Sequence, residues 1–252
     1  MKAKYISIFI MAAVVALLTY SVPAHASKTD SRIESSARQS HVFKTYLKND
    51  DIKIQSSNGA VTLTGIVSEE SHKSLARETV ASLPGVKSVD NKLEVKGVSP
   101  AKNSDAWLTT KVKSTLLFHS SVSGMTEVNT KGGIVTLRGD ADSQAQKDLT
   151  TEYVTDVEGV KGVNNEMTVS KSSKKTTRTA GDKIDDASIT AQVKLSLLYH
   201  RSTSGINTKV KTKNGVVTLD GKAGSAAAKN LATKLAKDVN GVKDVKNRMA
   251  IE

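Results

Sequence analysis

The residues best suited to chemistry in this chain of 252 residues are its histidines, because the chain contains no cysteine. Without thiolates, disulfides and cysteine-based metal sites are excluded. The histidines form no H-E-x-x-H pair or similar ligand spacing, and no set of histidine, serine and acid recurs along the chain. We therefore expect no metal, no cofactor, no catalytic residues and no enzymatic activity. The five histidines are His25, His41, His72, His119 and His200.

Two of the histidines follow an aromatic residue at the end of a helical pattern, as Phe118-His119 and Tyr199-His200. A histidine in the last turn of a helix interacts favourably with the helix dipole, and the aromatic ring can close a core, so a structural role explains both pairs. The alternative is a ligand-binding role. Trp107, the single tryptophan, is either packed or an anchor at a membrane interface. If the ligand is a membrane, we expect all five of these residues to contact lipid.

A stretch of seven residues that occurs three times organises the rest of the chain. Its pattern is Gly-x-Val-Thr-Leu-x-Gly, in which apolar residues alternate with threonine as in a half-buried strand. The opening glycine predicts a hairpin turn with positive φ, and the closing glycine predicts a bulge or a close backbone approach. A third glycine follows at a constant distance, where it is expected to end a helix. The spacing matches no phosphate-binding loop, so we interpret nine glycines as structural, namely Gly59, Gly65, Gly85, Gly133, Gly139, Gly159, Gly215, Gly221 and Gly241.

An amphipathic helix is predicted before each of these stretches. The second and third copies show it clearly, with apolar residues at i, i+4 and i+8, whereas the periodicity of residues 27–50 is imperfect. Asp105 stands at the predicted N-cap of the second copy. The apolar positions are Leu108, Val112 and Leu116 in the second copy and Ile189, Val193 and Leu197 in the third.

A second helix follows each stretch and leads into a third strand. Its predicted N-caps are Ser68, Asp142 and Gly224. An asparagine recurs in the third strand, and we interpret it as a turn or bulge residue that bonds nearby backbone; the three copies are Asn91, Asn165 and Asn247. A helix between two strands implies a right-handed crossover and parallel pairing. The predicted fold class is α+β, with three tandem α-β-β-α-β modules, each a three-stranded mixed sheet covered on one face by two helices.

Residues 1–26 have the pattern of a cleaved secretory signal. Two lysines precede an apolar run from Ile6 to Leu18, and the small-x-small site Ala24-His25-Ala26 follows. The run of about 13 residues is too short to span a bilayer, which needs roughly 20. We therefore expect cleavage after Ala26 and a bacterial periplasmic protein.

Three units follow the signal, at residues 28–97, 102–170 and 183–252. Residues 171–182 between the last two units are rich in lysine, serine and threonine without an apolar period, which predicts a flexible basic linker. Each unit contains its own two helices and three strands. We therefore expect the units to fold separately and to share no core.

The repeat resembles the BON-domain family (bacterial OsmY and nodulation) over essentially the whole mature chain. Three motifs carry the resemblance: Asp-Ala-x-Ile/Leu-Thr-x-x-Val-Lys at 105–113 and 186–194, Gly-x-Val-Thr-Leu-x-Gly in all three units, and Gly-Val-Lys-x-Val-x-Asn from residues 85, 159 and 241. Unit 1 departs from the first motif, and the familiar periplasmic member has two units rather than three. The resemblance implies a non-catalytic module that contacts phospholipid surfaces and supports envelope integrity, osmotic stress tolerance or the folding of exported proteins.

The charge of the chain favours an anionic partner. The mature chain keeps 35 Lys and Arg against 25 Asp and Glu, a net charge near +10, which suits an anionic membrane at about 1 kcal/mol per well-placed basic residue. The same charges also suit a merely solvated surface. We expect peripheral binding to an anionic phospholipid membrane, with chaperone-like binding of unfolded or outer-membrane client proteins as the alternative. A sequence pI of about 9.7 invites nucleic acid as a partner, but the secretory signal argues against it, so no nucleic acid is expected.

Overall fold

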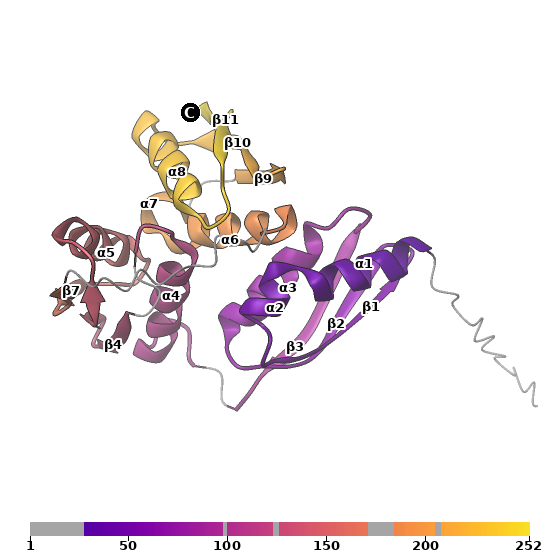
Figure 1. The fold of residues 1–252 in the computed structure, drawn as a ribbon, viewed down its shortest axis with the longest axis horizontal. Helices are drawn as coiled ribbons and strands as arrows, with labels where there is room; N and C mark the ends of the chain where they lie inside the picture. The colour runs from indigo at the N-terminus through magenta and orange to yellow at the C-terminus, as the bar shows by residue number, and fades with distance from the viewer. Residues whose placement is uncertain (1–27, 98–99, 123–125, 171–183, 205–207) are drawn as a thin grey trace, which may run out of the picture.

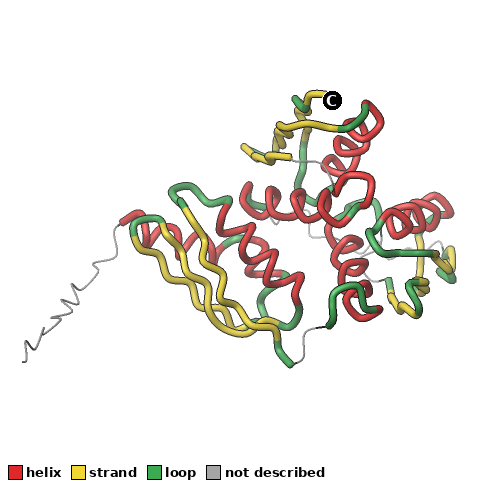
Figure 2. Tube along the Cα trace, turned by 180° about the vertical axis from the view of Figure 1, so that it is seen from behind, coloured by secondary structure: helices red, strands yellow, loops and turns green. Residues whose placement is uncertain are grey.

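The computed structural model describes residues 28–97, 100–122, 126–170, 184–204 and 208–252. The predicted signal at residues 1–26 and the predicted linker at 171–182 lie outside the described residues. The three units surround one helix, α6 (Asp186–Tyr199), which lies at the centre of Figure 1. The predicted fold class is confirmed, because each unit places its helices on one face of a mixed sheet, as the separate red and yellow layers of Figure 2 show.

Unit 1 has the strand order β1-β2-β3, with β1 antiparallel to β2 and β2 parallel to β3. Helix α3 makes the crossover between the parallel strands. The predicted first helix is broken in two, because Ser40 begins a new helix by accepting a hydrogen bond from the N–H of Phe43. The elements are α1 (Lys28–Gln39), α2 (His41–Thr45), β1 (Asp51–Ser57), β2 (Ala60–Val67), α3 (Glu70–Ala81) and β3 (Ser88–Val95).

Units 2 and 3 repeat this order of helices and strands, with short breaks in their sheets. Unit 2 contains α4 (Asp105–Phe118), β4 (Glu127–Lys131), β5 (Ile134–Arg138), β6 (Asp140–Ala141), α5 (Gln144–Asp156), β7 (Gly162–Asn165) and β8 (Thr168–Val169). Unit 3 contains α6, α7 (Arg201–Ser204), β9 (Thr208–Lys213), β10 (Val216–Ala223), α8 (Ala226–Asp238), β11 (Asp244–Asn247) and β12 (Ala250–Ile251).

The recurring asparagine lies at the break in the third strand of units 2 and 3, and in unit 1 Asn91 makes the same contacts within the unbroken β3. Asn247 accepts a hydrogen bond from the N–H of Met249 at 3.0 Å and donates to the carbonyl oxygen of Lys229 on α8 at 2.9 Å. The first contact is an Asx turn that diverts the amide of Met249 from the sheet, and the second ties the strand to the helix. Asn165 makes the same two contacts. The prediction that the asparagine bonds nearby backbone is confirmed, whereas its helix contact was not predicted.

The hairpin turn and the close approach predicted from the glycines are both present. In the turn of unit 1, Asn58 and Gly59 have φ values of 52° and 83°, the two positive angles of a type I′ turn. Gly65 lies inside β2 with φ of 120°, and a Cβ atom there would be 2.0 Å from the carbonyl oxygen of Asp51. Only glycine fits this position.

An aspartate in the first helix holds the hairpin turn of each unit. The Asp105 carboxylate accepts hydrogen bonds from the N–H groups of Gly132 and Gly133, at 2.7 and 2.8 Å, and these bonds lower its pKa. Asp30 and Asp186 make the equivalent pair of contacts in units 1 and 3. Each first helix is therefore tied to a turn that lies almost thirty residues further along the chain.

The predicted helix boundaries need small corrections. Asp105, Ser68, Asp142 and Gly224 were predicted as N-caps, but the caps are their immediate neighbours Ser104, Glu69, Ser143 and Ser225. The adjacent residues Asp142 and Ser143 can both cap a helix, so sequence alone does not choose between them. The glycines after the second helices, Gly85, Gly159 and Gly241, have the expected positive φ but lie in the turn beyond the C-cap.

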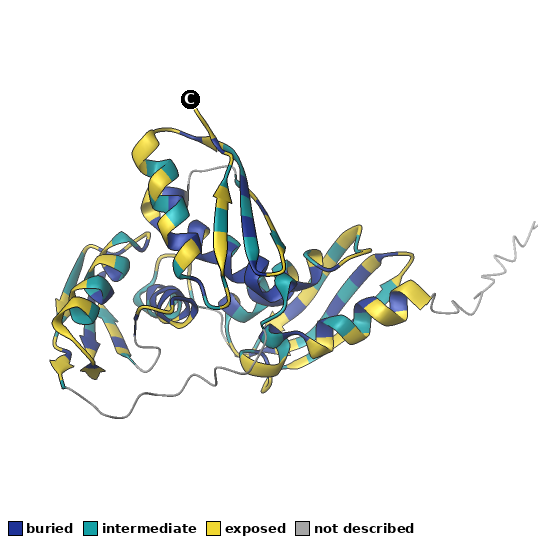
Figure 3. Ribbon diagram, turned by 45° about the horizontal axis from the view of Figure 1, so that its top comes forward, coloured by how far each residue is buried: buried dark blue, intermediate teal, exposed yellow. Residues whose placement is uncertain are grey.

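The units share an apolar core, which contradicts the prediction that they do not. Helix α6 has two apolar stripes. One stripe packs inside unit 3 and consists of Ile189, Val193 and Leu197. The other packs into the core of unit 1 and consists of Ala187, Ala191, Leu195 and Tyr199, joined by Phe118 from α4. A helix that is apolar on both sides must be covered on both sides, and Figure 3 shows dark blue, buried helices where the units meet.

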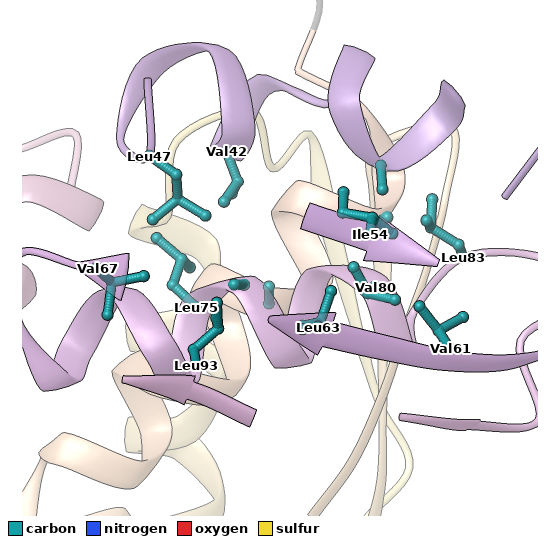
Figure 4. Packing of buried hydrophobic residues seen from close by; sticks show 14 of the residues in the cluster. Val42, Leu47, Ile54, Val61, Leu63, Val67, Leu75, Val80, Leu83 and Leu93 are labelled. Carbon is teal, nitrogen blue, oxygen red and sulfur yellow. The ribbon is translucent and has the colours of Figure 1, made fainter. Parts of the chain in front are cut away.

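The unit 1 side of this shared core is a sandwich of α3 on the sheet. Leu75 and Val80 of α3 face Leu63 of β2 and Leu93 of β3 in Figure 4. All four side chains are buried. The second stripe of α6 covers the outer side of α3, so unit 1 is complete only when unit 3 is present.

Candidate functional site at the junction of the units

The five residues predicted to contact lipid do not form one exposed surface. Phe118, His119, Tyr199 and His200 are buried where the units meet, and both histidines are 0% exposed. Trp107 is half-buried against the unit 2 core, with a lysine ammonium 4.4 Å from its ring centre. The structure therefore gives the first four residues a packing role at the junction, and of the five only Trp107 can reach a surface.

Units 2 and 3 meet through a reciprocal contact between their helix ends. His119, after α4, forms an isolated antiparallel bridge with Val239, after α8, and His200, after α6, forms the same bridge with Val157, after α5. Backbone hydrogen bonds of 2.9 and 3.0 Å flank the two bridges. In units 2 and 3, the end of each first helix thus meets the end of the second helix of the other unit. Such a reciprocal contact is typical of a pair related by a two-fold axis.

Each histidine also faces an aspartate of the other unit. His119 Nδ1 lies 3.3 Å from Asp238 Oδ2, and His200 Nδ1 lies 3.2 Å from Asp156 Oδ2. Tyr153 breaks the symmetry, because its ring stacks on His119 at 4.4 Å and its hydroxyl donates to Asp238 at 2.8 Å. The centres of the two imidazole rings are 5.6 Å apart. The junction therefore collects two imidazoles, two carboxylates and a phenol.

Burial and hydrogen bonding set the charges of this cluster. Burial and the neighbouring His200 together lower the pKa of His119 by more than its aspartate partner raises it, so the neutral imidazole is favoured. Burial would raise the pKa of Asp238, but hydrogen bonds from His119 and three hydroxyl groups lower this pKa to about 2. The pKa of Asp156 is also lowered, because hydrogen bonds from His200 and a serine outweigh its burial. Both aspartates are therefore ionised at neutral pH.

One part of the junction has the geometry of a Ser-His-Asp set. Ser196 Oγ lies 3.0 Å from His119 Nε2, while Asp238 faces Nδ1 of the same ring. Ser196 and His119 are fully buried, so no substrate reaches the hydroxyl, and the set acts as a contact between units 2 and 3. The matching partners in the two-fold arrangement are Thr115 and His200, but Thr115 Oγ1 and His200 Nε2 lack a hydrogen-bond partner among the described residues.

The two aspartates of the junction were not predicted from the sequence, although the repeat contains a signal for them. Units 2 and 3 carry Asp156-Val157 and Asp238-Val239 before the glycine that follows the second helix. Unit 1 has Ser82-Leu83 at the same place and lacks the aromatic-histidine pair. The aspartate and the histidine thus occur together in units 2 and 3, which pair with each other, and both are absent from unit 1.

Unit 1 is attached to α6 by polar contacts as well as by the shared core. The N–H of Val42 donates to Ser188 Oγ at 3.0 Å, near the start of α6. Two turns later, Lys194 forms an ion pair with Glu78 of α3 at 2.9 Å. Contacts from all three units therefore converge on α6.

Among the described residues, cavities lie between unit 1 and each of the other two units. The smaller of these, of about 380 Å³, lies between units 1 and 2. The larger, of about 650 Å³, lies between units 1 and 3, where its lining includes Lys73, Arg77, Glu70, Glu78 and the 53% exposed Leu198. Its volume is typical of a small-molecule site, but basic and acidic residues are mixed along its wall, so the lining does not select a class of ligand.

The described ranges contain no group of three or more His, Cys, Asp or Glu side chains arranged to hold a metal ion. None of the helices in these ranges combines the length and the apolarity needed to cross a membrane.

Comparison with known proteins assigns the repeat to a family. The family model of the BON domain matches residues 29–97, 104–171 and 185–252, which together make up most of the chain. The chain belongs to the BON-domain family. Its BON units are thus three in number, and each match coincides with one α-β-β-α-β module of the structure.

Two curated proteins resemble these BON units. The osmotically-inducible protein Y of Escherichia coli (strain K12) is 34% identical over 145 residues, which cover 57% of this chain and 70% of that protein. An uncharacterized protein in the gshII 5' region of Anaplasma centrale is 31% identical over 141 residues, covering 56% of this chain and 90% of that protein. A solved structure of CdsD, a structural protein of the type III secretion system of Chlamydia trachomatis, aligns over 87% of this chain and 90% of its own at 18% identity, but its TM-score of 0.24 is too low to carry an argument.

Proposed function

We propose that this protein is a non-catalytic periplasmic envelope protein that acts in osmotic stress and binds anionic phospholipid surfaces peripherally. Three observations support a role in the periplasm during osmotic stress: the BON units, the similarity to an osmotically inducible protein, and the secretory pattern of residues 1–26. The buried junction supports the non-catalytic part of the proposal, since its Ser-His-Asp set has no access to substrate.

The observation that carries the lipid-binding proposal is the uneven charge of the three units. Residues 185–252 contain 12 Lys and Arg against 6 Asp and Glu, a net charge of +6. Residues 29–97 have a net charge of +1, and residues 104–171 have a net charge of −2. A charge needed only for solubility has no reason to gather in one unit, whereas a surface that meets an anionic membrane does.

The size of this charge predicts weak binding. At about 1 kcal/mol for each basic residue near the membrane surface, a net charge of +6 supplies at most about 6 kcal/mol. On the affinity scale this corresponds to a Kd on the order of tens of micromolar. Binding should therefore be reversible and sensitive to salt, because screening shortens from about 10 Å at 0.1 M to 3 Å at 1 M.

Vesicle flotation with a parallel aggregation assay tests the proposal. The mature protein, residues 27–252, is mixed with vesicles of phosphatidylglycerol or with neutral phosphatidylcholine vesicles at low salt. We expect flotation with the anionic vesicles only. Absence of flotation, together with suppressed aggregation of an unfolded client in a lipid-free assay, would replace lipid binding by the chaperone-like function.

A further inference from the structure

The unit 3 sheet has one face covered by helices and one open face. Val210, Val217 and Leu219 point to the helices and are buried, so the residues that alternate with them point outward. The hydroxyl of Thr212 on β9 bonds Thr190 of α6, which confirms that the lysines on either side of Thr212 face away from the helices. We call the basic residues of the open face the lysine face; they are Lys209, Lys211, Lys213, Lys222, Lys246 and Arg248, all exposed.

The strand register brings these cations together across the sheet. On β10, Thr218 pairs with Lys211 of β9 on one side and with Lys246 of β11 on the other. Two ammonium groups therefore flank a small central threonine. Along β9 itself, lysines occupy three successive outward positions, at intervals of about 7 Å.

Most of these cations have no acidic partner. Lys222 pairs with Glu252 at 2.7 Å. Among the described residues, none of the other five members of the lysine face forms an ion pair. Asp220 and Asp244 share the open face, but Asp244 lies 3.6 Å from Lys237, outside the lysine face. The face is therefore a region of excess positive charge.

The same positions in the other units are not basic. The central row of the sheet is Lys211-Thr218-Lys246 in unit 3, Asn129-Thr136-Asn164 in unit 2 and Gln55-Thr62-Asp90 in unit 1. The six positions of the lysine face correspond in unit 2 to Glu127, Asn129, Lys131, Asp140, Asn164 and Glu166. The fold does not require lysine at these places, so their presence in unit 3 needs its own cause.

Protection of sheet edges is one such cause, because charged residues on an edge strand discourage pairing with other chains. β9 and β11 are both edge strands. In units 1 and 2, however, the edge strands β1, β3 and β4 carry mixed charges and β7 carries none, and edge protection does not depend on the sign of the charge. An anionic partner does require the positive sign.

We propose that the lysine face of unit 3 is the surface that docks on anionic phospholipid headgroups. This rests on the proposed function and assigns it to one side of one sheet. A flat open sheet with long, flexible lysine stems fits a layer of headgroups, since lysine is a point charge that needs no fixed acceptor geometry. Single-stranded nucleic acid fits less well, because strands β9 to β12 carry no aromatic side chain on which bases could stack. A DNA duplex needs no stacking, so it is the competing partner in the test.

Charge reversal with a matched control tests the assignment. In the mature protein, Lys211→Glu with Lys246→Glu keeps the edge strands charged but reverses the centre of the lysine face. The control, Lys113→Glu with Lys234→Glu, changes net charge equally through exposed lysines of α4 and α8. We expect the first pair to weaken flotation with phosphatidylglycerol vesicles about tenfold or more, and the control pair to weaken it less than threefold.

A variant with gained function covers the case in which the reversed variant fails to fold. Asn129→Lys with Asn164→Lys builds the unit 3 row into unit 2. We expect this variant to bind phosphatidylglycerol vesicles several-fold more tightly than the native protein. Thermal unfolding of each variant shows whether it is folded.

The outcomes separate the two levels of the proposal. If the native protein does not float with anionic vesicles, the proposed function itself is wrong. Two outcomes in a protein that does float would show that another surface meets the lipid and that the lysine face is not the site. In the first, the two charge-reversal variants lose binding equally. In the second, Trp107 fluorescence shifts to the blue while the variant with Lys211→Glu and Lys246→Glu still binds. Tighter binding to a DNA duplex than to anionic vesicles at equal salt would overturn the choice of partner.

Discussion

Replacing Leu195 with alanine tests whether α6 belongs to two units at once. Leu195 is in unit 3 by sequence, but its side chain lies in the core of unit 1 and is 2% exposed. The change removes buried carbon atoms at about 0.8 kcal/mol per CH₂ and leaves a cavity, so the free energy of unfolding should fall by about 3 kcal/mol. If the units were independent, an outward residue of α6 would tolerate the change.

Urea unfolding and hydrogen exchange measure the effect. The matched control is Leu198→Ala on the same helix, where the side chain is 53% exposed, and it should cost less than about 0.5 kcal/mol. In the Leu195→Ala variant, exchange should accelerate in α3 of unit 1, which α6 covers. A cost below about 0.5 kcal/mol, without faster exchange in α3, would refute the shared core.

Three further predictions follow from local contacts. Gly65→Ala should lower the free energy of unfolding by more than about 2 kcal/mol, because its φ is 120° and a Cβ would lie 2.0 Å from a β1 carbonyl oxygen. The control Gly97→Ala, at φ of 77° with no atom within 4 Å of the added Cβ, should cost about 1 kcal/mol. Equal shifts of the two variants in thermal unfolding would contradict this prediction. Asn247→Ala should cost about 1–3 kcal/mol in urea unfolding, because the N–H of Met249 loses its acceptor and the part-buried bond to the Lys229 carbonyl is lost, and a neutral result would count against the link between strand and helix. The contact between units 2 and 3 should weaken in acid in two steps. It weakens first as pH falls below 6.5, because the unfolded chain protonates His119 before the folded one does, and again as pH falls from 3.8 towards about 2, where Asp238 loses its charge. Hydrogen exchange of the end of α4 at pH 7, 5 and 3 measures this weakening, and constant exchange free energies would contradict it.

The order of elements could be predicted from sequence because each element carries its own local period. Alternation around the glycines indicated strands, and the spacing of Leu108, Val112 and Leu116 indicated a helix with one buried face. The repeat made each assignment in one unit a check on the others. Local periodicity is therefore enough to define the module.

The arrangement of the modules could not be predicted in the same way. The second stripe of α6 includes Ala187 and Ala191, small residues that are common on exposed helix faces, so only their partner in unit 1 shows that they are buried. A signal was present, since α6 is apolar on both sides and such helices are buried. The four junction residues predicted as lipid contacts are buried between the units instead. Their partners Asp156 and Asp238 each lie in the other unit of the pair, so the signal for them in the sequence was their joint occurrence with the histidines in units 2 and 3, not a local period.

Lysine footprinting of residues 27–252 with and without vesicles tests most directly whether the lysine face meets the membrane. An amine-reactive label is applied in the presence of phosphatidylglycerol or phosphatidylcholine vesicles, and mass spectrometry measures the reactivity of each lysine. We expect anionic vesicles to protect Lys209, Lys211, Lys213 and Lys246. Lys131 of unit 2 should keep its reactivity, and neutral vesicles should protect none of these lysines. Protection confined to units 1 and 2, or no protection in a protein that floats with the anionic vesicles, would contradict this expectation.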